Sequence, residues 1–115
     1  MINIELLQEA ILCTKSKNYK KAEEIYSKLL EENPNESILL SAAGLFHLSL
    51  NEYDKAIGML KKSYDIKKTI GTVSALGFAQ YNSENYADAV KYFEEALNYG
   101  ESFDIYEKLV DRKSV

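Results

Sequence analysis

The chain has 115 residues, of which 46% are hydrophobic and 28% charged, and this composition is typical of one soluble globular domain. Its net charge of −4 gives no general attraction to phosphate backbones or anionic lipid, which argues against nucleic-acid binding through a basic surface. The sequence has no run near 18 apolar residues, no signal-peptide pattern and only one cysteine, so we expect a cytoplasmic protein without membrane insertion or an internal disulfide.

Two amphipathic helices are predicted at the start of the chain. The first covers residues 3–15, where apolar residues recur three and four positions apart. The second covers residues 19–32 and has an apolar stripe opposite a face rich in lysine and glutamate. The pair Lys17-Asn18 separates them. Asn33-Pro34-Asn35 ends the second helix, because the residue before proline avoids helical backbone.

Residues 36–49 are apolar nearly all round, which indicates a helix covered on more than one side and therefore the middle element of the domain. Asn51-Glu52 forms the next turn, and residues 53–66 form an amphipathic helix with lysines near its C-terminal end, where they complement the helix dipole. Helices are also expected over residues 70–80 and 86–98, the latter closed by Gly100 as a left-handed stop. Ser102 is expected to cap a last helix that runs to about residue 112.

A pattern repeats along these helices. Small residues recur 34 and then 33 positions apart, and alanines recur with the same two spacings: Ala10, Gly44 and Gly77, then Ala22, Ala56 and Ala89. A tyrosine stands three before each alanine, and a large apolar residue four after it: Tyr26, Leu60 and Phe93. A period of this length indicates stacked helical hairpins. We expect the small residues to face the alanines of their own hairpin and the large residues to fill the gap toward the next hairpin.

The pattern resembles that of the tetratricopeptide repeat family, W-x2-L-G-x2-Y followed by A-x3-F, a further alanine and a terminal proline. The matching repeats are residues 37–69, residues 70–103 and, with a weaker fit, residues 3–36, where Glu9 replaces an apolar residue. The resemblance implies an all-α, right-handed α-solenoid of three antiparallel helix hairpins in a single domain over residues 1–115. Residues 102–112 then form a seventh, capping helix, or the damaged start of a fourth repeat.

In this family the first helices of the hairpins line a concave groove that holds a peptide or a helix. The matching positions, mostly apolar here, are Ile4, Leu7, Ile11, Lys15, Ile38, Ser41, Leu45, Leu48, Ser49, Ser74, Phe78, Tyr81 and Asn82. An apolar groove suits the apolar face of an amphipathic helix. Two alternatives stay open: the C-terminal segment covers the groove, or another copy of the chain does.

One subfamily grips the C-terminal carboxylate of chaperones with lysine, asparagine and arginine side chains. The matching positions here are Leu7, Ile11, Ala42, Gly71 and Ala75. None of these side chains can donate a hydrogen bond, so the resemblance does not extend to chaperone-tail binding.

The sequence gives no sign of catalysis, of a metal site or of a cofactor. His47 is the only histidine and occupies a motif position that packs between helices, while Cys13 occupies a position expected to be buried. Adjacent glutamates such as Glu94-Glu95 point about 100° apart on a helix, so they do not converge as an acid and base would. We therefore predict a non-catalytic protein-protein interaction scaffold. The alternatives are a self-associating module and a regulatory or targeting domain of a larger enzyme, such as a glycosyltransferase.

Overall fold

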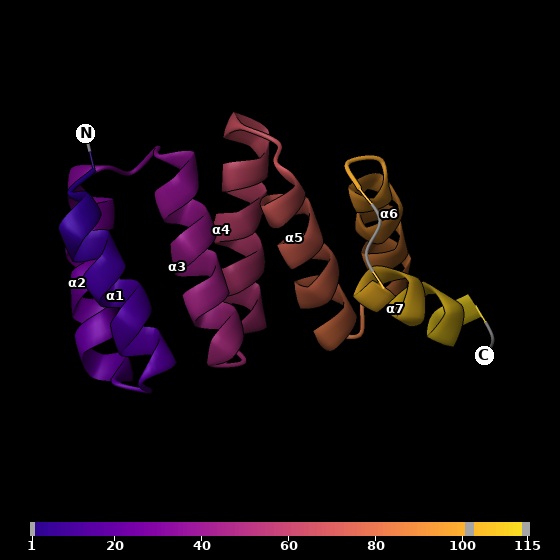
Figure 1. The fold of residues 1–115 in the computed structure, drawn as a ribbon, viewed down its shortest axis with the longest axis horizontal. Helices are drawn as coiled ribbons and strands as arrows, with labels where there is room; N and C mark the ends of the chain where they lie inside the picture. The colour runs from indigo at the N-terminus through magenta and orange to yellow at the C-terminus, as the bar shows by residue number, and fades with distance from the viewer. Residues whose placement is uncertain (1, 101–102, 114–115) are drawn as a thin grey trace.

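The computed structural model describes residues 2–100 and 103–113, and every regular element in these ranges is an α-helix. The helices are α1 (Ile4–Lys15), α2 (Tyr19–Glu32), α3 (Ser37–Ser49), α4 (Tyr53–Ile66), α5 (Ile70–Asn82), α6 (Tyr86–Leu97) and α7 (Phe103–Lys113). Figure 1 shows three antiparallel hairpins side by side, with the N-terminal hairpin at one end and α7 at the other. The predicted all-α solenoid with a seventh helix is confirmed.

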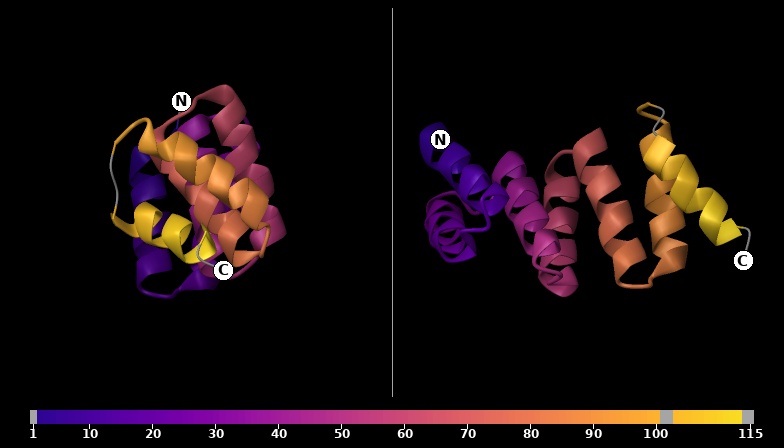
Figure 2. Two further views of the ribbon diagram at one scale, coloured as in Figure 1. Left: turned by 90° about the vertical axis from the view of Figure 1, so that its right-hand side faces the viewer. Right: turned by 60° about the horizontal axis from the view of Figure 1, so that its bottom comes forward.

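The hairpins stack so that the helices form two layers. The first helix of each hairpin lies in one layer (α1, α3 and α5), and the second helix lies in the other (α2, α4 and α6), as Figures 1 and 2 show. Within the first layer α1 contacts α3 and α3 contacts α5. The assembly extends over 43 × 26 × 22 Å, so it is elongated along the stacking direction.

The first helix of each hairpin ends in the same way. Lys17, Asn51 and Glu84 follow these helices with left-handed backbone, at φ of 64°, 61° and 68°. The next residue then donates its N–H to a carbonyl five positions back, from Asn18 to Cys13 at 2.8 Å and from Asn85 to Gln80 at 2.8 Å. This is the Schellman ending, which satisfies the last carbonyls of a helix.

The predicted left-handed stop at Gly100 is wrong. No glycine among the described residues has positive φ; α6 ends at Leu97, and its C-cap Asn98 has right-handed backbone, φ −69° and ψ −20°. The N–H groups of Asn98 and Tyr99 instead reach back three positions, to Glu95 and Ala96, both at 3.0 Å. Hydrogen bonds that span three residues, as in a 3₁₀-helix, can end an α-helix without a residue in the left-handed conformation.

The small residues allow the two helices of a hairpin to approach closely. A Cβ atom on Gly44 would lie 2.7 Å from Cγ of Leu60, and one on Gly77 would lie 2.5 Å from Cδ1 of Phe93. Leu60 and Phe93 therefore pack onto the glycine of their own hairpin. Leu60 also shares a core cluster with Ala75, Leu76 and Ala79 of the next hairpin, and Phe93 shares one with Ile105 and Leu109 of α7, in agreement with the prediction that they fill the gap toward the next unit. Tyr26 likewise reaches the next hairpin, where its ring centroid lies 5.2 Å from that of Phe46.

The two ends of the stack are finished differently. In α1, Glu5 and Leu12 are exposed, whereas the residues 34 positions later, Leu39 and Phe46, are buried against the first hairpin. At the other end, Ile105 and Leu109 of α7 are buried against the last hairpin, and Figure 2 shows α7 inclined across α6. The predicted cap at Ser102 lies outside the described residues. Within the described ranges, no helix is long and apolar enough to cross a membrane.

Candidate partner-binding groove

The layer formed by α1, α3 and α5 carries the candidate site. Neither α3 nor α5 contains an aspartate, glutamate, lysine or arginine, whereas α2, α4 and α6 carry the alternating lysines and acids of the opposite layer. Charged side chains avoid burial, so a helix face without them is suited to contact with apolar groups. The fold thus places two helices without charged residues, α3 and α5, on one side of the stack, beside α1, which carries Glu5, Glu9 and Lys15.

Two hollows lie along this surface. The small hollow, of about 210 Å³, lies between α1 and α3 and is lined by residues that include Ile11, Lys15, Tyr26 and Phe46. The large hollow, of about 510 Å³, lies between α3 and α5 and is lined by residues that include Ile38, Ser41, Thr69, Thr72 and Ala75. Leu45 lines both hollows. We call the two together the groove.

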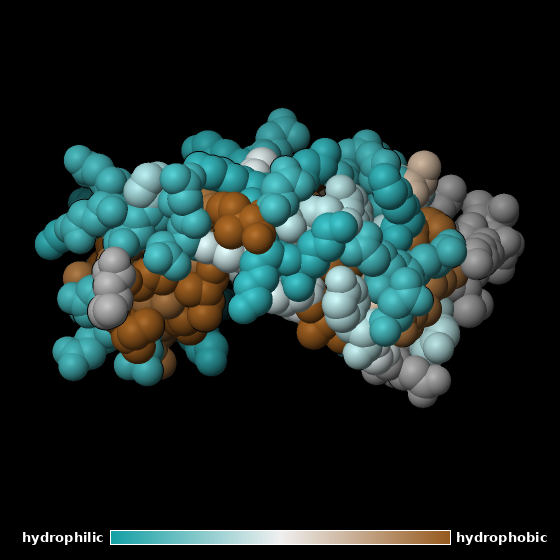
Figure 3. All heavy atoms as spheres, turned by 90° about the horizontal axis from the view of Figure 1, so that it is seen from above, coloured by the Kyte–Doolittle hydropathy of each residue, from teal (hydrophilic) through white to brown (hydrophobic). Residues whose placement is uncertain are grey.

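Exposed apolar side chains border the groove. Ile38 is 62% exposed, Leu45 is 49% exposed, and Ile4 and Ile11 are exposed as well. Figure 3, which views the molecule from above, shows the broadest apolar area of that face over the end formed by α1 to α3. The predicted residues Lys15 and Ser49 are also exposed, while Ser41, Leu48 and Ser74 are half-buried.

Leu7 corrects the predicted lining of the groove. Its side chain is 5% exposed and lies in the core cluster with Ala10, Tyr26 and Leu29, so it offers little surface to a partner. Ile4, Leu7 and Ile11 lie along the same stripe of α1, but Leu7 is on the side of that stripe that packs against α2. Helical spacing identifies the stripe but does not show which of its residues are buried against a neighbouring helix.

The third repeat contributes less to the groove than predicted. Phe78 packs edge-on against Phe93, with ring centroids 5.0 Å apart, and is half-buried. Tyr81 packs on Tyr86, and Nζ of Lys108 in α7 lies 4.9 Å from the centre of its ring. Aromatic packing and a contact from α7 thus occupy part of this end of the predicted groove, while the two hollows beside Leu45 stay open.

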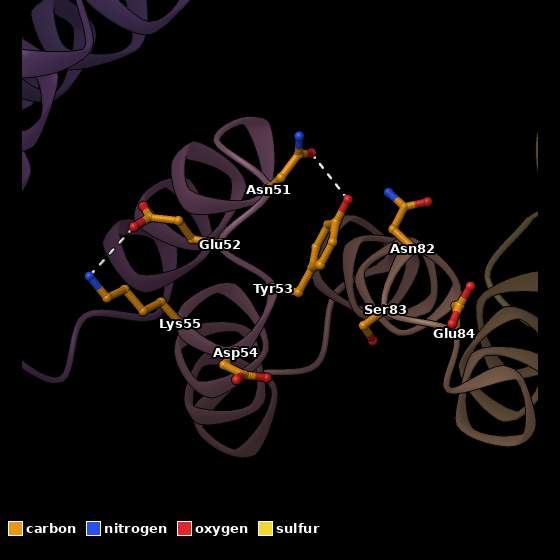
Figure 4. Close-up of a pocket in the computed structure, with 8 residues that line it drawn as sticks. All are labelled: Asn51, Glu52, Tyr53, Asp54, Lys55, Asn82, Ser83 and Glu84. Carbon is orange, nitrogen blue, oxygen red and sulfur yellow. Dashed lines mark hydrogen bonds and ion pairs between the residues drawn. The ribbon is translucent and has the colours of Figure 1, made fainter.

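Asn82 belongs to a different surface. It lines a hollow of about 490 Å³ at the edge of the stack, between the α3–α4 and α5–α6 turns, together with Tyr53, Lys55 and Glu84. Figure 4 shows that the polar side chains around this edge hollow come from the two turns and the start of α4. Tyr53 donates a hydrogen bond to Asn51 at 3.1 Å, and Lys55 lies 3.5 Å from Glu52.

A chain of hydroxyl groups under the large hollow was missed by the sequence analysis. Ser41 Oγ lies 2.7 Å from Ser63 Oγ and 2.8 Å from Thr72 Oγ1, which joins α3 to both α4 and α5. Ser37 and Thr69 extend the chain at its two ends. Ser63 and Thr72 are almost completely buried, and each has hydrogen-bond partners, as buried polar groups require.

His47 is buried and structural. Its Nδ1 lies 2.9 Å from Oε1 of Glu52, and its ring packs edge-on against Phe46. This hydrogen bond, followed by the charge of Lys55, lowers the pKa of the Glu52 carboxyl below its usual 4.5. Gln80 and Asn85 form the equivalent contact one repeat later, at 2.9 Å.

Cys13 is half-buried, and no three His, Cys, Asp or Glu residues in the described part of the chain could together hold a metal ion.

The chain is similar to a family model and to a curated protein. Residues 15–96 match the family model described as anaphase-promoting complex, cyclosome, subunit 3. The small glutamine-rich tetratricopeptide repeat-containing protein 2 of Mycosarcoma maydis is 28% identical over 105 residues, which cover 90% of this chain and 30% of that protein. The chain thus spans less than a third of that relative.

The fold is shared by solved structures that include the following two. The Sgt2 TPR domain from Aspergillus fumigatus superposes with a TM-score of 0.84 and 24% identity, over 96% of this chain and 76% of that one. The first TPR of Spaghetti (RPAP3), bound to the HSP90 peptide SRMEEVD, superposes with a TM-score of 0.89 and 17% identity, over 96% and 90% of the two chains.

Proposed function

This chain belongs to the tetratricopeptide repeat proteins, in the family described as anaphase-promoting complex, cyclosome, subunit 3, and from that premise we propose that it is a non-catalytic protein-interaction module. Its partner is an uncharged or amphipathic segment, helical or extended, of another protein. The binding site is the groove along α1, α3 and α5. We propose a cytoplasmic location, as the sequence led us to expect.

The observation that carries this proposal is the exposed apolar edge of the groove, formed by Ile11, Ile38 and Leu45 over the two hollows. A contiguous apolar surface with hollows beside it is the usual form of a binding site for an apolar side chain or helix. Ile11, Ile38 and Leu45 are 36%, 62% and 49% exposed, so burying what remains of them contributes roughly 2 to 4 kcal/mol before the cost of association is subtracted. This magnitude supports weak, reversible binding.

The relatives support a peptide partner but not the same chemistry. The RPAP3 structure holds a peptide with two glutamates and a terminal aspartate, and an acidic peptide needs cationic or donor side chains to receive it. The positions that supply such donors in the chaperone-binding subfamily are occupied here by residues such as Leu7, Ala42 and Ala75, and α3 and α5 carry no charged group. We therefore favour a partner with an uncharged apolar face.

Peptide selection followed by groove variants tests the proposal. Peptides of 12 random residues are selected by phage display on the immobilised chain, and their affinities are measured by fluorescence polarisation. We expect Leu45→Glu and Ile38→Glu to weaken binding at least tenfold, because each places a charge on the apolar edge. Leu12→Glu is the matched control, since Leu12 is 63% exposed and lines neither hollow.

The outcomes are separable. Circular dichroism establishes that each variant keeps its helical content, so a loss of binding then reports the surface itself. Retained binding by both Leu45→Glu and Ile38→Glu would refute the groove as the site. Light scattering on the free chain addresses the self-associating alternative: a monomer at all concentrations favours a foreign partner, whereas a dimer that Leu45→Glu dissociates would assign the groove to a second copy.

A further inference from the structure

We infer that the edge formed by the three hairpin turns is self-complementary and joins two copies of this chain in a weak, salt-sensitive dimer. The basic α1–α2 turn of one copy lies against the acidic edge hollow of the other copy, and the reverse contact forms at the same time. This edge is separate from the groove. The inference therefore goes beyond the proposed function and leaves the groove open to its partner.

The three turns lie along one edge of the stack. The α1–α2, α3–α4 and α5–α6 turns all fall on the lower edge of the molecule in Figure 1. Each turn joins the C-terminal end of one helix to the N-terminal end of the next, so the two helix dipoles oppose each other there. The charged side chains therefore set the sign of the electrostatic potential along this edge.

The α1–α2 turn is strongly basic. Lys15, Lys17, Lys20 and Lys21 fall within seven residues of the sequence, and no acidic residue stands among them. All four lysines are exposed. Lys21 pairs with Glu9 at 2.8 Å, whereas the other three lysines form no ion pair with any residue that the structure describes. Three ammonium groups of this turn are thus available to a partner.

The edge hollow has the opposite charge. Among the residues that line it, Glu52, Asp54 and Glu84 are acidic and Lys55 is basic. Lys55 lies 3.5 Å from Glu52, and Figure 4 shows this pair on the far side of Tyr53 from Glu84. Asp54 and Glu84 are exposed and form no ion pair within residues 2–100 and 103–113. Two carboxylates therefore line the hollow without a paired cation.

The opposite charges stand at equivalent positions of different repeats. Lys17 and Glu84 are separated by the two repeat spacings of 34 and 33 positions, and both have left-handed backbone, at φ of 64° and 68°. Lys20 and Asp54 are separated by the first of these spacings and stand at the starts of α2 and α4. The sign of the charge thus changes along the edge while the backbone of the turns is kept.

A two-fold axis across the edge fits this arrangement. In an isologous dimer both copies use the same patch, so every contact between a turn and a hollow occurs twice. An axis that crosses the edge between the first two turns brings the basic turn of each copy to the hollow of the other. Both contacts then join opposite charges, whereas an axis parallel to the edge would set each turn against its own copy.

Sedimentation equilibrium of the full chain measures this dimer. Ion pairs between exposed side chains contribute little each and are screened by salt, so we expect a dimer only at high protein concentration and low salt. The dissociation constant should rise at least about tenfold between about 20 mM and about 500 mM salt. Leu45→Glu should leave the dimer intact, because Leu45 lines the groove and not the edge hollow.

Two charge-exchanged variants test the contact itself. Variant A carries Lys17→Glu and Lys20→Asp, and variant B carries Glu84→Lys and Asp54→Lys. Each substitution installs the residue found at the equivalent position of another repeat, so both variants are compatible with the fold. Each variant alone sets like charges together in its homodimer and should self-associate at least about tenfold more weakly than the wild type.

Mixing the two variants separates this contact from a general effect of charge. In the heterodimer of A and B both contacts again join opposite charges, so an equimolar mixture should associate as the wild type does. The chain with all four exchanges has the composition and net charge of the wild type, and it should dimerise equally well. Lys61→Glu with Lys62→Glu is the matched control for variant A, because it changes the net charge equally at exposed positions of α4 that do not line the edge hollow.

Four outcomes would overturn the inference. The wild-type chain could stay monomeric at about 1 mM protein and about 20 mM salt. The control could weaken the dimer as much as variant A does, or the mixture of A and B could fail to associate. A dimer that Leu45→Glu dissociates would place the second copy in the groove instead of at the edge.

Discussion

The close approach of α5 and α6 at Gly77 gives the sharpest test of the packing. A Cβ atom on Gly77 would lie 2.5 Å from both Cδ1 and Cε1 of Phe93, a separation that real Cβ contacts do not show. Phe93 is 1% exposed, and its ring is also in contact with Phe78, so it cannot swing into solvent. Gly77→Ala must therefore displace the ring or separate the two helices.

The magnitude follows from two opposing effects. Alanine in place of glycine within a helix favours folding by about 1 kcal/mol. Overpacking a filled core costs about 1 to 3 kcal/mol. At so short a distance from a rigid ring we take the upper half of that range, so Gly77→Ala should lower the free energy of unfolding by about 1 to 2 kcal/mol. Gly58→Ala is the matched control: its Cβ would meet nothing within 4 Å, so the substitution should stabilise.

Urea unfolding followed by circular dichroism measures both variants. We expect the midpoint to fall for Gly77→Ala and to rise for Gly58→Ala, with unchanged slopes, since the surface exposed on unfolding stays the same. Combining Gly77→Ala with Phe93→Leu should cost less than the sum of the two single changes, because a smaller side chain gives the new methyl group room. If Gly77→Ala stabilises as much as Gly58→Ala does, the proposed packing of Gly77 on Phe93 is refuted.

Three further predictions concern backbone and ionisation. Glu84→Gly should raise the free energy of unfolding by about 1 kcal/mol in urea titrations, because Glu84 holds φ of 68°, whereas Asn51→Gly should change it by less, since asparagine tolerates this conformation. The hydrogen bond that Tyr64 donates to Glu95 raises the pKa of the Tyr64 phenol to about 12. The stability that this bond contributes is present below pH 10 and is lost as the pH rises through 12. A ¹³Cζ NMR titration should show a Tyr64 pKa of about 12, and Glu95→Gln should return that pKa toward 10. The hydrogen bond between Glu52 and His47 lowers the pKa of the Glu52 carboxyl below 4.5. The Glu52 carboxylate therefore stabilises the fold above pH 4.5, and this contribution is lost as the pH falls through the pKa of the folded state. In Glu52→Gln, the free energy of unfolding measured between pH 3 and 6 should depend less on pH.

The elements could be predicted from the sequence because each boundary has a local cause. Asn33-Pro34-Asn35 stops α2 at Glu32, and the polar pairs at residues 17–18 and 51–52 separate helices whose apolar periodicity restarts immediately afterwards. The recurring glycine and alanine positions fix which helices pair. The pairing can be predicted because the packing of the two helices of a hairpin depends on residues that are close in sequence.

Features that depend on several helices could not be predicted in this way. The hydroxyl chain joins residues 22 to 31 positions apart, and it requires the rotation of α3, α4 and α5 about their axes to be known together. The contact of Lys108 with the Tyr81 ring depends on the angle at which α7 crosses the last hairpin. Gly100 was misjudged because glycine is common after helices but is not needed where the last N–H groups reach back three positions.

Methyl NMR of the chain with a selected peptide tests the central claim most directly. If the groove along α1, α3 and α5 is the binding surface, titration should shift the methyl signals of Ile11, Ile38 and Leu45 and leave those of Ile25 and Ile57 in α2 and α4 in place. Shifts confined to the methyl groups of α2 and α4, with Ile38 and Leu45 unchanged at saturation, would contradict it.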